Sequence, residues 1–295
     1  MKEPVFRGCC TALITPFSED GIDYARLGAL LDRQAEAGVA AVVIAGTTGE
    51  NATLEDAEYA QLLPYCVQRI HGAMKVIAGI GGNHTLHCME KAVLAEQAGA
   101  DALLMSTPYY NKSTQRGLAA HFSYVADRSA LPLILYNVPS RTGIGIEAET
   151  YRILSEHPNI NGVKEASGNI SLAARIMAEC GDELNVWSGN DDQTVPMMAL
   201  GAKGVVSVAS NVVPEVTVRL CEHCEQQDYS AAAALFAQYE PLCRALFAET
   251  NPIPVKAAMQ MLGLDSGTLR LPLVELAPEH RSALEECLRN TNLLQ

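Results

Sequence analysis

Short apolar runs rich in β-branched residues recur along the chain, and an amphipathic segment follows each of them. Eight such runs predict strands, over Thr11–Ile14, Ala41–Ala45, Lys75–Gly79, Ala102–Ser106, Leu133–Val138, Gly162–Lys164, Asn185–Ser188 and Gly204–Val208. The intervening segments repeat apolar residues every three or four positions, which predicts helices over Tyr24–Ala37, Leu54–Ile70, Thr85–Ala98, Gln115–Asp127, Ala148–Glu156, Ser171–Cys180, Gln193–Leu200 and Glu215–Gln226. Eight strand–helix units in series predict a (β/α)8 TIM barrel. A doubly wound parallel sheet is the alternative, because the number of strands does not by itself require closure.

Three more helical patterns follow the eighth unit without strands of their own, over Ser230–Ala248, Pro254–Leu262 and Pro278–Leu294. They predict a C-terminal helical extension of the barrel. We therefore expect a barrel domain over residues 1–227 that carries the active site, and a helical domain over residues 228–295. No low-complexity linker separates the two parts, so tight packing between them is expected.

The composition agrees with an α/β protein and narrows its partners. Hydrophobic residues make up 48% of the 295 residues and charged residues 19%, which supports a packed core. The formal charge is -13 with no run of Lys or Arg, which argues against a nucleic-acid partner. The first residues form no signal peptide and no stretch has membrane-spanning length, so we expect a cytoplasmic protein without a membrane partner.

Metal and cofactor sites find little support in the sequence. The nine cysteines include one C-x-x-C and no second pair at zinc-site spacing, which is typical of free thiols. His84 and His87 have no evident third ligand. The chain has no Walker sequence, no G-x-S-x-G and no G-x-G-x-x-G after a strand. We expect neither a metal nor an organic cofactor.

Polar residues gather where the predicted strands end, which is where barrels of this type carry their reactive groups. Lys164 ends the sixth strand, and period-two alternation places it on one face with Gly162 and Ala166. If that face is the barrel interior, the small neighbours leave a cavity above the ammonium. Desolvation would then lower the pKa of the lysine and make its amine a nucleophile that forms a Schiff base with a ketone. The alternatives are a lysine that reaches solvent and one that pairs with Glu165.

Hydroxyl groups at other strand ends suggest a proton relay beside Lys164. Tyr136 ends the fifth strand, Thr47 follows the second, and Tyr110 follows the fourth. A phenol can exchange a proton with a carbinolamine when a second hydroxyl passes it onward. A buried tyrosine that only fills the top of the barrel is the alternative for Tyr136.

The loops offer two candidate carboxylate sites. Consecutive N–H groups and hydroxyls at Thr47 and Thr48 form a small anion-binding turn, unless the turn is only structural. Arg141 can bind a carboxylate with two hydrogen bonds, unless it forms a surface ion pair. The acids Asp191 and Asp192 follow the seventh strand, where a phosphate would otherwise bind, which favours a non-phosphorylated substrate.

Five separated motifs occur in a fixed order and resemble one enzyme family. They are GTTGE (Gly46–Glu50), TPYYNK (Thr107–Lys112), YNVPSRTG (Tyr136–Gly143), GVKEASG (Gly162–Gly168) and NPIPVK (Asn251–Lys256). The resemblance is to the 4-hydroxy-tetrahydrodipicolinate synthases, of the pyruvate-dependent class I aldolase and N-acetylneuraminate lyase superfamily. It extends over the whole chain, including the C-terminal helices.

The resemblance implies a lyase that condenses pyruvate with L-aspartate 4-semialdehyde in the diaminopimelate route to lysine. It implies that Lys164 forms the pyruvate Schiff base and that Tyr136, Thr47 and Tyr110 relay protons, with Tyr110 supplied across a subunit interface. It further implies that Thr47 and Thr48 hold the pyruvate carboxylate and Arg141 that of the semialdehyde. Gly189 and Val206 would line the site through their backbones. The expected assembly is a homotetramer built as a dimer of dimers.

Feedback-regulated members of that family bind lysine in a cleft at a dimer interface. The matching positions here are Asn51, Ala52, Asp56, Tyr59, Asn83, His87 and Tyr109. Regulated bacterial members often carry histidines where Asp56 and Tyr59 stand, and an acid where His87 stands. Because His87 cannot pair with an ammonium as that acid does, weak or absent inhibition by lysine is predicted.

Two alternatives to this function remain at the level of sequence. One is another Schiff-base lyase of the superfamily, an N-acetylneuraminate lyase or a 2-keto-3-deoxy sugar-acid aldolase. GTTGE and the run Ser140-Arg141-Thr142 favour the synthase, and no hydroxyl-binding set for a sugar acid is evident. The other is a keto-acid-binding regulator without turnover, against which the full set of polar residues argues.

Overall fold

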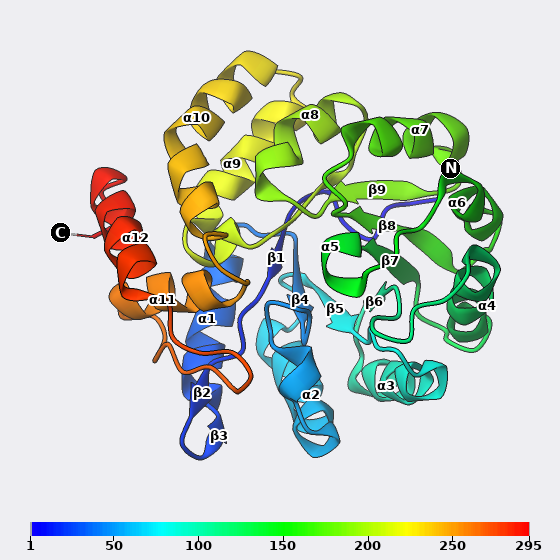
Figure 1. Cartoon of the computed structure of the whole chain (residues 1–295), viewed down its shortest axis with the longest axis horizontal. Helices are drawn as coiled ribbons and strands as arrows, with labels where there is room; N and C mark the ends of the chain where they lie inside the picture. The colour runs from blue at the N-terminus through cyan, green and yellow to red at the C-terminus, as the bar shows by residue number, and fades with distance from the viewer. Residues whose placement is uncertain (1, 295) are drawn as a thin grey trace.

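A closed barrel of eight parallel strands, surrounded by helices, forms the centre of the computed structural model, which describes residues 2–294 (Figure 1). The barrel strands are β1 (Gly8–Ala12), β4 (Ala41–Ile44), β5 (Lys75–Gly79), β6 (Ala102–Ser106), β7 (Leu133–Asn137), β8 (Ile160–Glu165), β9 (Asn185–Ser188) and β10 (Gly204–Ser207). They follow one another around the barrel in sequence order, and β1 pairs with both β4 and β10. The predicted TIM barrel is confirmed, and the doubly wound sheet is excluded.

The helices follow the predicted succession closely. They are α1 (Tyr24–Glu36), α2 (Asp56–Ile70), α3 (Thr85–Ala98), α4 (Gln115–Ala126), α5 (Pro139–Thr142), α6 (Ala148–Ser155), α7 (Ile170–Cys180), α8 (Thr194–Ala199), α9 (Pro214–Glu225), α10 (Tyr229–Ala245), α11 (Ile253–Met261) and α12 (Pro278–Asn290). The one-turn helix α5 and a small hairpin, β2 (Phe17–Ser18) with β3 (Gly21–Ile22), were not predicted.

The barrel strands are buried on both faces, so the chain has an inner and an outer core. Inward-facing side chains such as Val43, Ile77 and Leu104 fill the barrel, and the alternate positions pack against the helices. Trp187, which is fully buried, stacks on Phe6 with ring centroids 4.9 Å apart. Because Phe6 lies just before β1, this aromatic pair fills the amino-terminal end of the barrel.

The helices after α9 lie together on one side of the barrel (Figure 1). Helix α10 begins just after the predicted boundary at residue 227 and packs against α8 and α9, as well as α12. This packing joins the C-terminal part directly to the outer layer of the barrel. The division into two domains stays a prediction.

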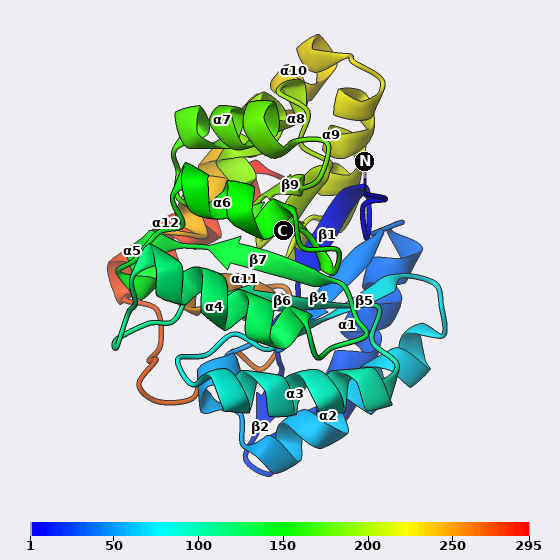
Figure 2. The same ribbon diagram turned by 90° about the vertical axis from the view of Figure 1, so that its right-hand side faces the viewer.

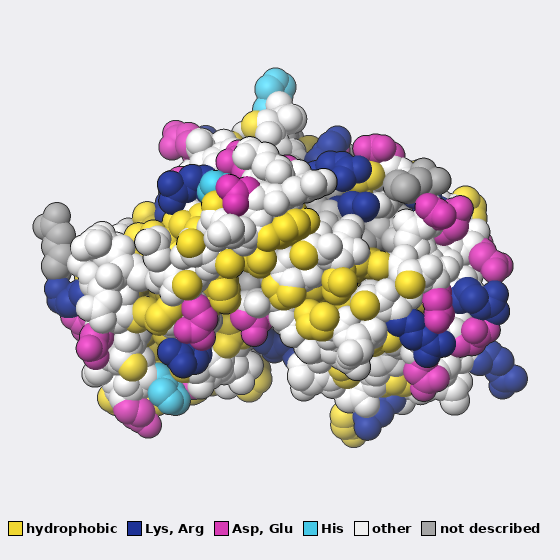
Figure 3. Space-filling view, turned by 90° about the horizontal axis from the view of Figure 1, so that it is seen from above, with side chains coloured by type: hydrophobic (Ala, Val, Ile, Leu, Met, Phe, Trp, Pro, Cys, Tyr) yellow, Lys and Arg dark blue, Asp and Glu magenta, His cyan; other side chains and the backbone are white. Residues whose placement is uncertain are grey.

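The outer surface near α8 and α10 carries hydrophobic side chains across its middle, with charged side chains mostly toward its edges (Figure 3). Over residues 2–294, no helix combines the length and the apolar character that crossing a bilayer requires.

Candidate active site at the carboxyl end of the barrel

The carboxyl ends of the strands open on a large pocket. Strand β7 points toward α5, which marks this end of the molecule (Figure 2). The pocket has a volume of about 430 Å³, and Thr47, Tyr136 and Arg141 are among its lining residues. Of the other predicted site residues, Lys164, Thr48, Gly189, Val206 and Tyr110 lie outside that lining. The predicted set is therefore divided: three residues line the pocket, Lys164, Thr48 and Val206 are buried, and Tyr110 is exposed.

Lys164 lies on the interior face of β8, as the alternation predicted. It pairs in register with Tyr136 of β7, and its Nζ lies 4.3 Å from the centroid of the Tyr136 ring. Only 5% of its surface is exposed. Glu165 points the other way, where its carboxylate accepts hydrogen bonds from Asn137 Nδ2 and Tyr151 Oη. Both alternatives for Lys164, contact with solvent and an ion pair with Glu165, are therefore excluded.

Space beside the Lys164 side chain exists on one side only. A Cβ atom added to Gly162 would lie 2.5 Å from a ring carbon of Trp187, so that side is filled, contrary to the sequence expectation. On the other side, a Cβ atom added to Gly189 would lie 3.1 Å from Lys164 Cε and 2.6 Å from Ala166 Cβ. Glycine at position 189 thus leaves room for the lysine stem, and the accessible side faces the carboxyl end.

Asp191 occupies the region where a phosphate would bind in many barrels. Its Oδ2 atom accepts the backbone N–H groups of Val208 and Ala209, each at 3.0 Å. Burial raises the pKa of this carboxyl, while hydrogen bonds and the positive charge of Lys164 act in the opposite direction. Because these N–H groups are already used, this end of the barrel does not favour a phosphorylated ligand. The neighbouring Val206 packs in the barrel interior with Tyr136.

The Thr47–Thr48 turn is held by a residue to which the sequence reasoning gave no role. Asn251 Nδ2 donates to Thr48 Oγ1 at 2.9 Å, and the Asn251 carbonyl accepts Arg141 Nη2 at 2.9 Å. One residue of the C-terminal part therefore contacts both predicted carboxylate sites, through Thr48 and Arg141. Within the described chain, the buried Asn251 Oδ1 has no hydrogen-bond partner. The only sequence signal for it was its place in the NPIPVK motif.

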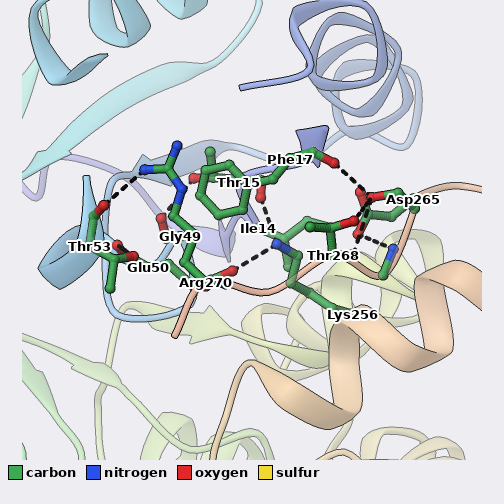
Figure 4. Close-up of polar contacts among 12 residues, drawn as sticks. Ile14, Thr15, Phe17, Gly49, Glu50, Thr53, Lys256, Asp265, Thr268 and Arg270 are labelled. Carbon is green, nitrogen blue, oxygen red and sulfur yellow. Dashed lines mark hydrogen bonds and ion pairs between the residues drawn. The ribbon is translucent and has the colours of Figure 1, made fainter. Parts of the chain in front are cut away.

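A buried ion pair fixes the other end of the same turn (Figure 4). Lys256 Nζ donates to Glu50 Oε1 at 2.7 Å and to the Thr15 carbonyl at 2.9 Å. Glu50 Oε2 accepts the backbone N–H of Arg270 at 3.1 Å, and Arg270 also donates to the Thr53 carbonyl. Glu50 has a left-handed φ of 56°, which is uncommon for a residue with a side chain. The C-terminal part thus holds this backbone conformation through two residues.

Tyr110 does not reach the other predicted relay residues within one chain. Its side chain is 92% exposed, and its backbone φ is 67°. No hydrogen bond connects Tyr110, Tyr136 and Thr47 among residues 2–294. The relay stays a prediction, and an exposed Tyr110 is what its expected action on a neighbouring subunit requires.

Five of the seven predicted regulatory positions line the same pocket. Asn51, Ala52, Asn83, His87 and Tyr109 are in its lining, whereas Asp56 and Tyr59 are not. Asp56 is nevertheless bound to His87, with 2.9 Å between Oδ1 and Nε2. In the described part of the chain, no three His, Cys, Asp or Glu residues form a group that could hold a metal.

The chain as a whole is similar to one family of known proteins. The model of the dihydrodipicolinate synthetase family matches residues 5–291. The 4-hydroxy-tetrahydrodipicolinate synthase of Thermoanaerobacter sp. (strain X514) is 44% identical over 293 residues, covering 99% of both chains. The dihydrodipicolinate synthase structure from Aquifex aeolicus superimposes with a TM-score of 0.96 at 43% identity, covering 98% of this chain and 99% of that one. The Acinetobacter baumannii enzyme, solved in complex with pyruvate, has a TM-score of 0.96 at 37% identity, with 98% and 99% covered.

Proposed function

We propose the function of this chain from the premise that it belongs to the dihydrodipicolinate synthetase family. The chain is a lyase of the Schiff-base aldolase type and acts as a 4-hydroxy-tetrahydrodipicolinate synthase. Its substrates are pyruvate and L-aspartate 4-semialdehyde, and its reaction lies in the diaminopimelate route to lysine. We further propose the roles of individual residues and the assembly given below.

The placement of Lys164 is the observation that supports the covalent mechanism. The neutral amine adds to the ketone carbon of pyruvate, and loss of water gives a protonated imine. The imine draws electrons from the adjacent methyl group, which loses a proton and becomes an enamine carbon. Tyr136, whose ring lies 4.3 Å from Lys164 Nζ, is the nearest candidate to move protons to and from the carbinolamine oxygen.

The enamine carbon then attacks the aldehyde carbon of the second substrate, whose oxygen takes up a proton. The amino group of that substrate adds to the imine carbon and expels the Lys164 amine, which closes the ring. We assign the pyruvate carboxylate to Thr47 and Thr48, and the semialdehyde carboxylate to Arg141. The hydrogen bonds from Asn251 to Thr48 and from Arg141 to Asn251 support this assignment, because they fix the two groups relative to each other.

Borohydride reduction in the presence of pyruvate tests the covalent step. Mass measurement of the digested protein is expected to find one reduced pyruvyl group on the peptide that carries Lys164. Lys164→Arg is the matched control. It keeps the positive charge, but the guanidinium stays protonated at neutral pH and forms no Schiff base. A wild-type protein that folds, binds pyruvate and gains no adduct at Lys164 would reject the mechanism.

A coupled assay tests the second substrate. We expect turnover with pyruvate and L-aspartate 4-semialdehyde, and no comparable cleavage of N-acetylneuraminate or 2-keto-3-deoxy sugar acids. Faster cleavage of a sugar acid than condensation with the semialdehyde would assign the chain to another branch of the superfamily.

An exposed Tyr110 fits the expected homotetramer, a dimer of dimers. The expected location of this assembly is the cytoplasm. In such an assembly the Tyr110 phenol of one subunit would complete the proton relay of its neighbour. Sedimentation of the purified protein tests the number of subunits, and a monomer with full activity would contradict the role of Tyr110.

A further inference from the structure

A serine hydroxyl that the proposed mechanism does not use lies on the wall of the active-site pocket. Ser106 is the last residue of β6 and lines the pocket together with Thr47, Tyr136 and Arg141. The residue is half-buried, and among residues 2–294 its hydroxyl makes no hydrogen bond. A serine hydroxyl has one donor and two acceptor positions, so its full bonding capacity is available to a ligand.

The strand register places Ser106 in the same layer of the barrel as the proposed catalytic groups. Ser106 pairs with Tyr136 of β7, and Tyr136 pairs with Lys164 of β8. Ala102 and Leu104 of the same strand belong to the inner core, so by alternation the side chain of Ser106 also points into the barrel. Three inward side chains therefore lie next to one another at the carboxyl ends of neighbouring strands.

The strand on the other side of β6 leaves the Ser106 hydroxyl uncovered. The chain continues from β5 to Gly81, where an added Cβ atom would lie 2.5 Å from Ser106 Oγ. At Gly79, which ends β5, an added Cβ atom would overlap the carbonyl oxygen of Ala45. Both glycines line the pocket, so no side chain from this part of the chain separates the hydroxyl from the ligand space.

A hydrogen bond between two threonines brings Ser106 and Arg141 to the same part of the pocket wall. Thr107 follows Ser106 in the chain, and Thr142 follows Arg141. Thr107 Oγ1 donates to Thr142 Oγ1 at 2.8 Å, so the two segments are bonded at the residues next to the pocket-lining ones. A ligand whose carboxylate is bound by Arg141 therefore presents the groups beside that carboxylate to the wall that contains Ser106.

The pocket offers no free acid to a positively charged group. Glu50 is the acid among the lining residues, and its carboxylate is paired with Lys256 at 2.7 Å. Lys91 and Arg141, which also line the pocket, are cations. L-aspartate 4-semialdehyde has an ammonium group on the carbon that carries its carboxylate. Among the described residues that line the pocket, a neutral acceptor is therefore left to bind this ammonium.

We propose that the Ser106 hydroxyl binds the amino group of the second substrate and makes the site specific for an aldehyde that carries one. This inference rests on the proposed function, whose last step needs the neutral amine. An acid in contact with the ammonium would hold the proton on the nitrogen. A serine hydroxyl accepts a hydrogen bond from the ammonium and donates one to the neutral amine, so it binds both states without taking up the proton itself.

Ser106→Ala removes the hydroxyl and keeps the Cβ atom. Because the variant loses a hydrogen bond to a charged group, its KM for L-aspartate 4-semialdehyde is expected to rise about tenfold, with kcat less affected. The KM for pyruvate should change less than about twofold, since that substrate has no amino group. Ser106→Thr keeps a hydroxyl and should restore the KM to within about threefold of wild type. Ser230→Ala, which removes an exposed hydroxyl from α10, is the matched control and should change neither constant.

Succinate semialdehyde separates recognition of the amino group from a change in the shape of the pocket. It has the same aldehyde and carboxylate as the second substrate but no amino group, and it is added as a competitor of that substrate. Its inhibition constant should agree within about twofold between wild type and Ser106→Ala, because this ligand never makes the hydrogen bond that the variant loses. A variant that folds incompletely would have fewer active sites, which lowers the rate but changes neither KM nor the inhibition constant.

Three results would overturn the proposal while leaving the proposed function intact. An unchanged KM for L-aspartate 4-semialdehyde in Ser106→Ala would exclude the contact. An equal loss of affinity for both semialdehydes would show that Ser106 acts on the aldehyde or the carboxylate, or only shapes the pocket. A rise in the KM for pyruvate alone would place the hydroxyl at the Schiff-base centre. Wild-type protein that does not turn over L-aspartate 4-semialdehyde would instead reject the proposed function, and this inference with it.

Discussion

The ion pair between Lys256 and Glu50 allows a test of how the C-terminal part supports the proposed pyruvate site. Lys256→Met removes the ammonium and keeps most of the volume of the side chain. Both side chains are buried, 0% and 1% exposed, and the two charged atoms lie 2.7 Å apart. Removing one partner of such a pair leaves the other charge buried without compensation, at a typical cost of about 3–5 kcal/mol. Because Glu50 keeps the N–H of Arg270, we expect a loss near the lower end, about 3 kcal/mol.

The assay is urea denaturation of wild type and variants at one protein concentration, since the stability of an oligomer depends on concentration. Lys75→Met is the matched control, because Lys75 Nζ also lies 2.7 Å from a carboxylate oxygen, that of Asp101. Its side chain is 54% exposed, so the control is expected to lose less than about 1 kcal/mol. Because both ion pairs have the same N–O distance, the difference in stability loss between the two variants reports the effect of burial.

The double variant Glu50→Gln/Lys256→Met separates the charge from the packing. It removes both charges, so we expect it to be more stable than Lys256→Met alone. The KM for pyruvate should rise in Lys256→Met with kcat less affected, because the Thr47–Thr48 turn loses a support for ground-state binding. The reasoning is refuted if Lys256→Met loses no more stability than Lys75→Met, or if the double variant is no better than the single one.

Three further predictions concern other buried or exposed groups. Burial lowers the pKa of His121 from 6.5 to about 4, so the unfolded chain takes up a proton at this residue before the native chain does as the pH falls below 6.5. The free energy of unfolding should therefore decrease toward pH 4 by up to about 3 kcal/mol more in wild type than in His121→Gln. Urea titrations in which both proteins show the same dependence on pH would contradict this. Among the cysteines of residues 2–294, Cys287 is partly exposed and the others are buried, and burial raises the pKa of Cys9 to about 12. N-ethylmaleimide should therefore label Cys287 first, and early labelling of Cys9 in the native protein would be contrary evidence. Mixed oligomers of Tyr110→Phe and Lys164→Ala should regain activity that neither variant has, because one hybrid site combines both intact residues, and no recovery in verified hybrids would exclude action across subunits.

The periodic segments of the sequence predicted the fold well because each strand and helix carries its own pattern. The bounds of β5, β6, β9 and α3 agree with the prediction to the residue. The prediction for the first strand, Thr11–Ile14, was displaced from the observed β1, Gly8–Ala12. Gly8, Cys9 and Cys10 lack a β-branched pattern, and they belong to the strand because they pair with β10 where the barrel closes. Closure is a property of the whole barrel, which a local pattern does not contain.

The candidate site was predicted where the signal was local and missed where it depended on distant partners. The strand ends placed Lys164 beside Tyr136 because adjacent parallel strands bring their carboxyl ends together. Lys91 and Asn251 were not singled out, since the first contacts Asn51 and the second contacts Thr48, far away in the sequence. Nothing in the residues around Lys91 shows that its side chain is buried, which the structure has at 7% exposed.

The predicted division at residue 227 assigned the active site to the barrel part alone, and the contacts of the C-terminal part argue for a wider site. Asn251 and Lys256 hold opposite ends of the Thr47–Glu50 turn, and Asn251 also holds Arg141. If this turn and Arg141 bind the two carboxylates, both substrates depend on a segment beyond the eighth barrel unit. A barrel ending at residue 227 would deprive the Glu50 carboxylate of Lys256 and of the Arg270 N–H, although Glu50 has a left-handed conformation that is uncommon for a glutamate. The turn is therefore expected to lose its geometry in such a fragment, even if the eight strands still close.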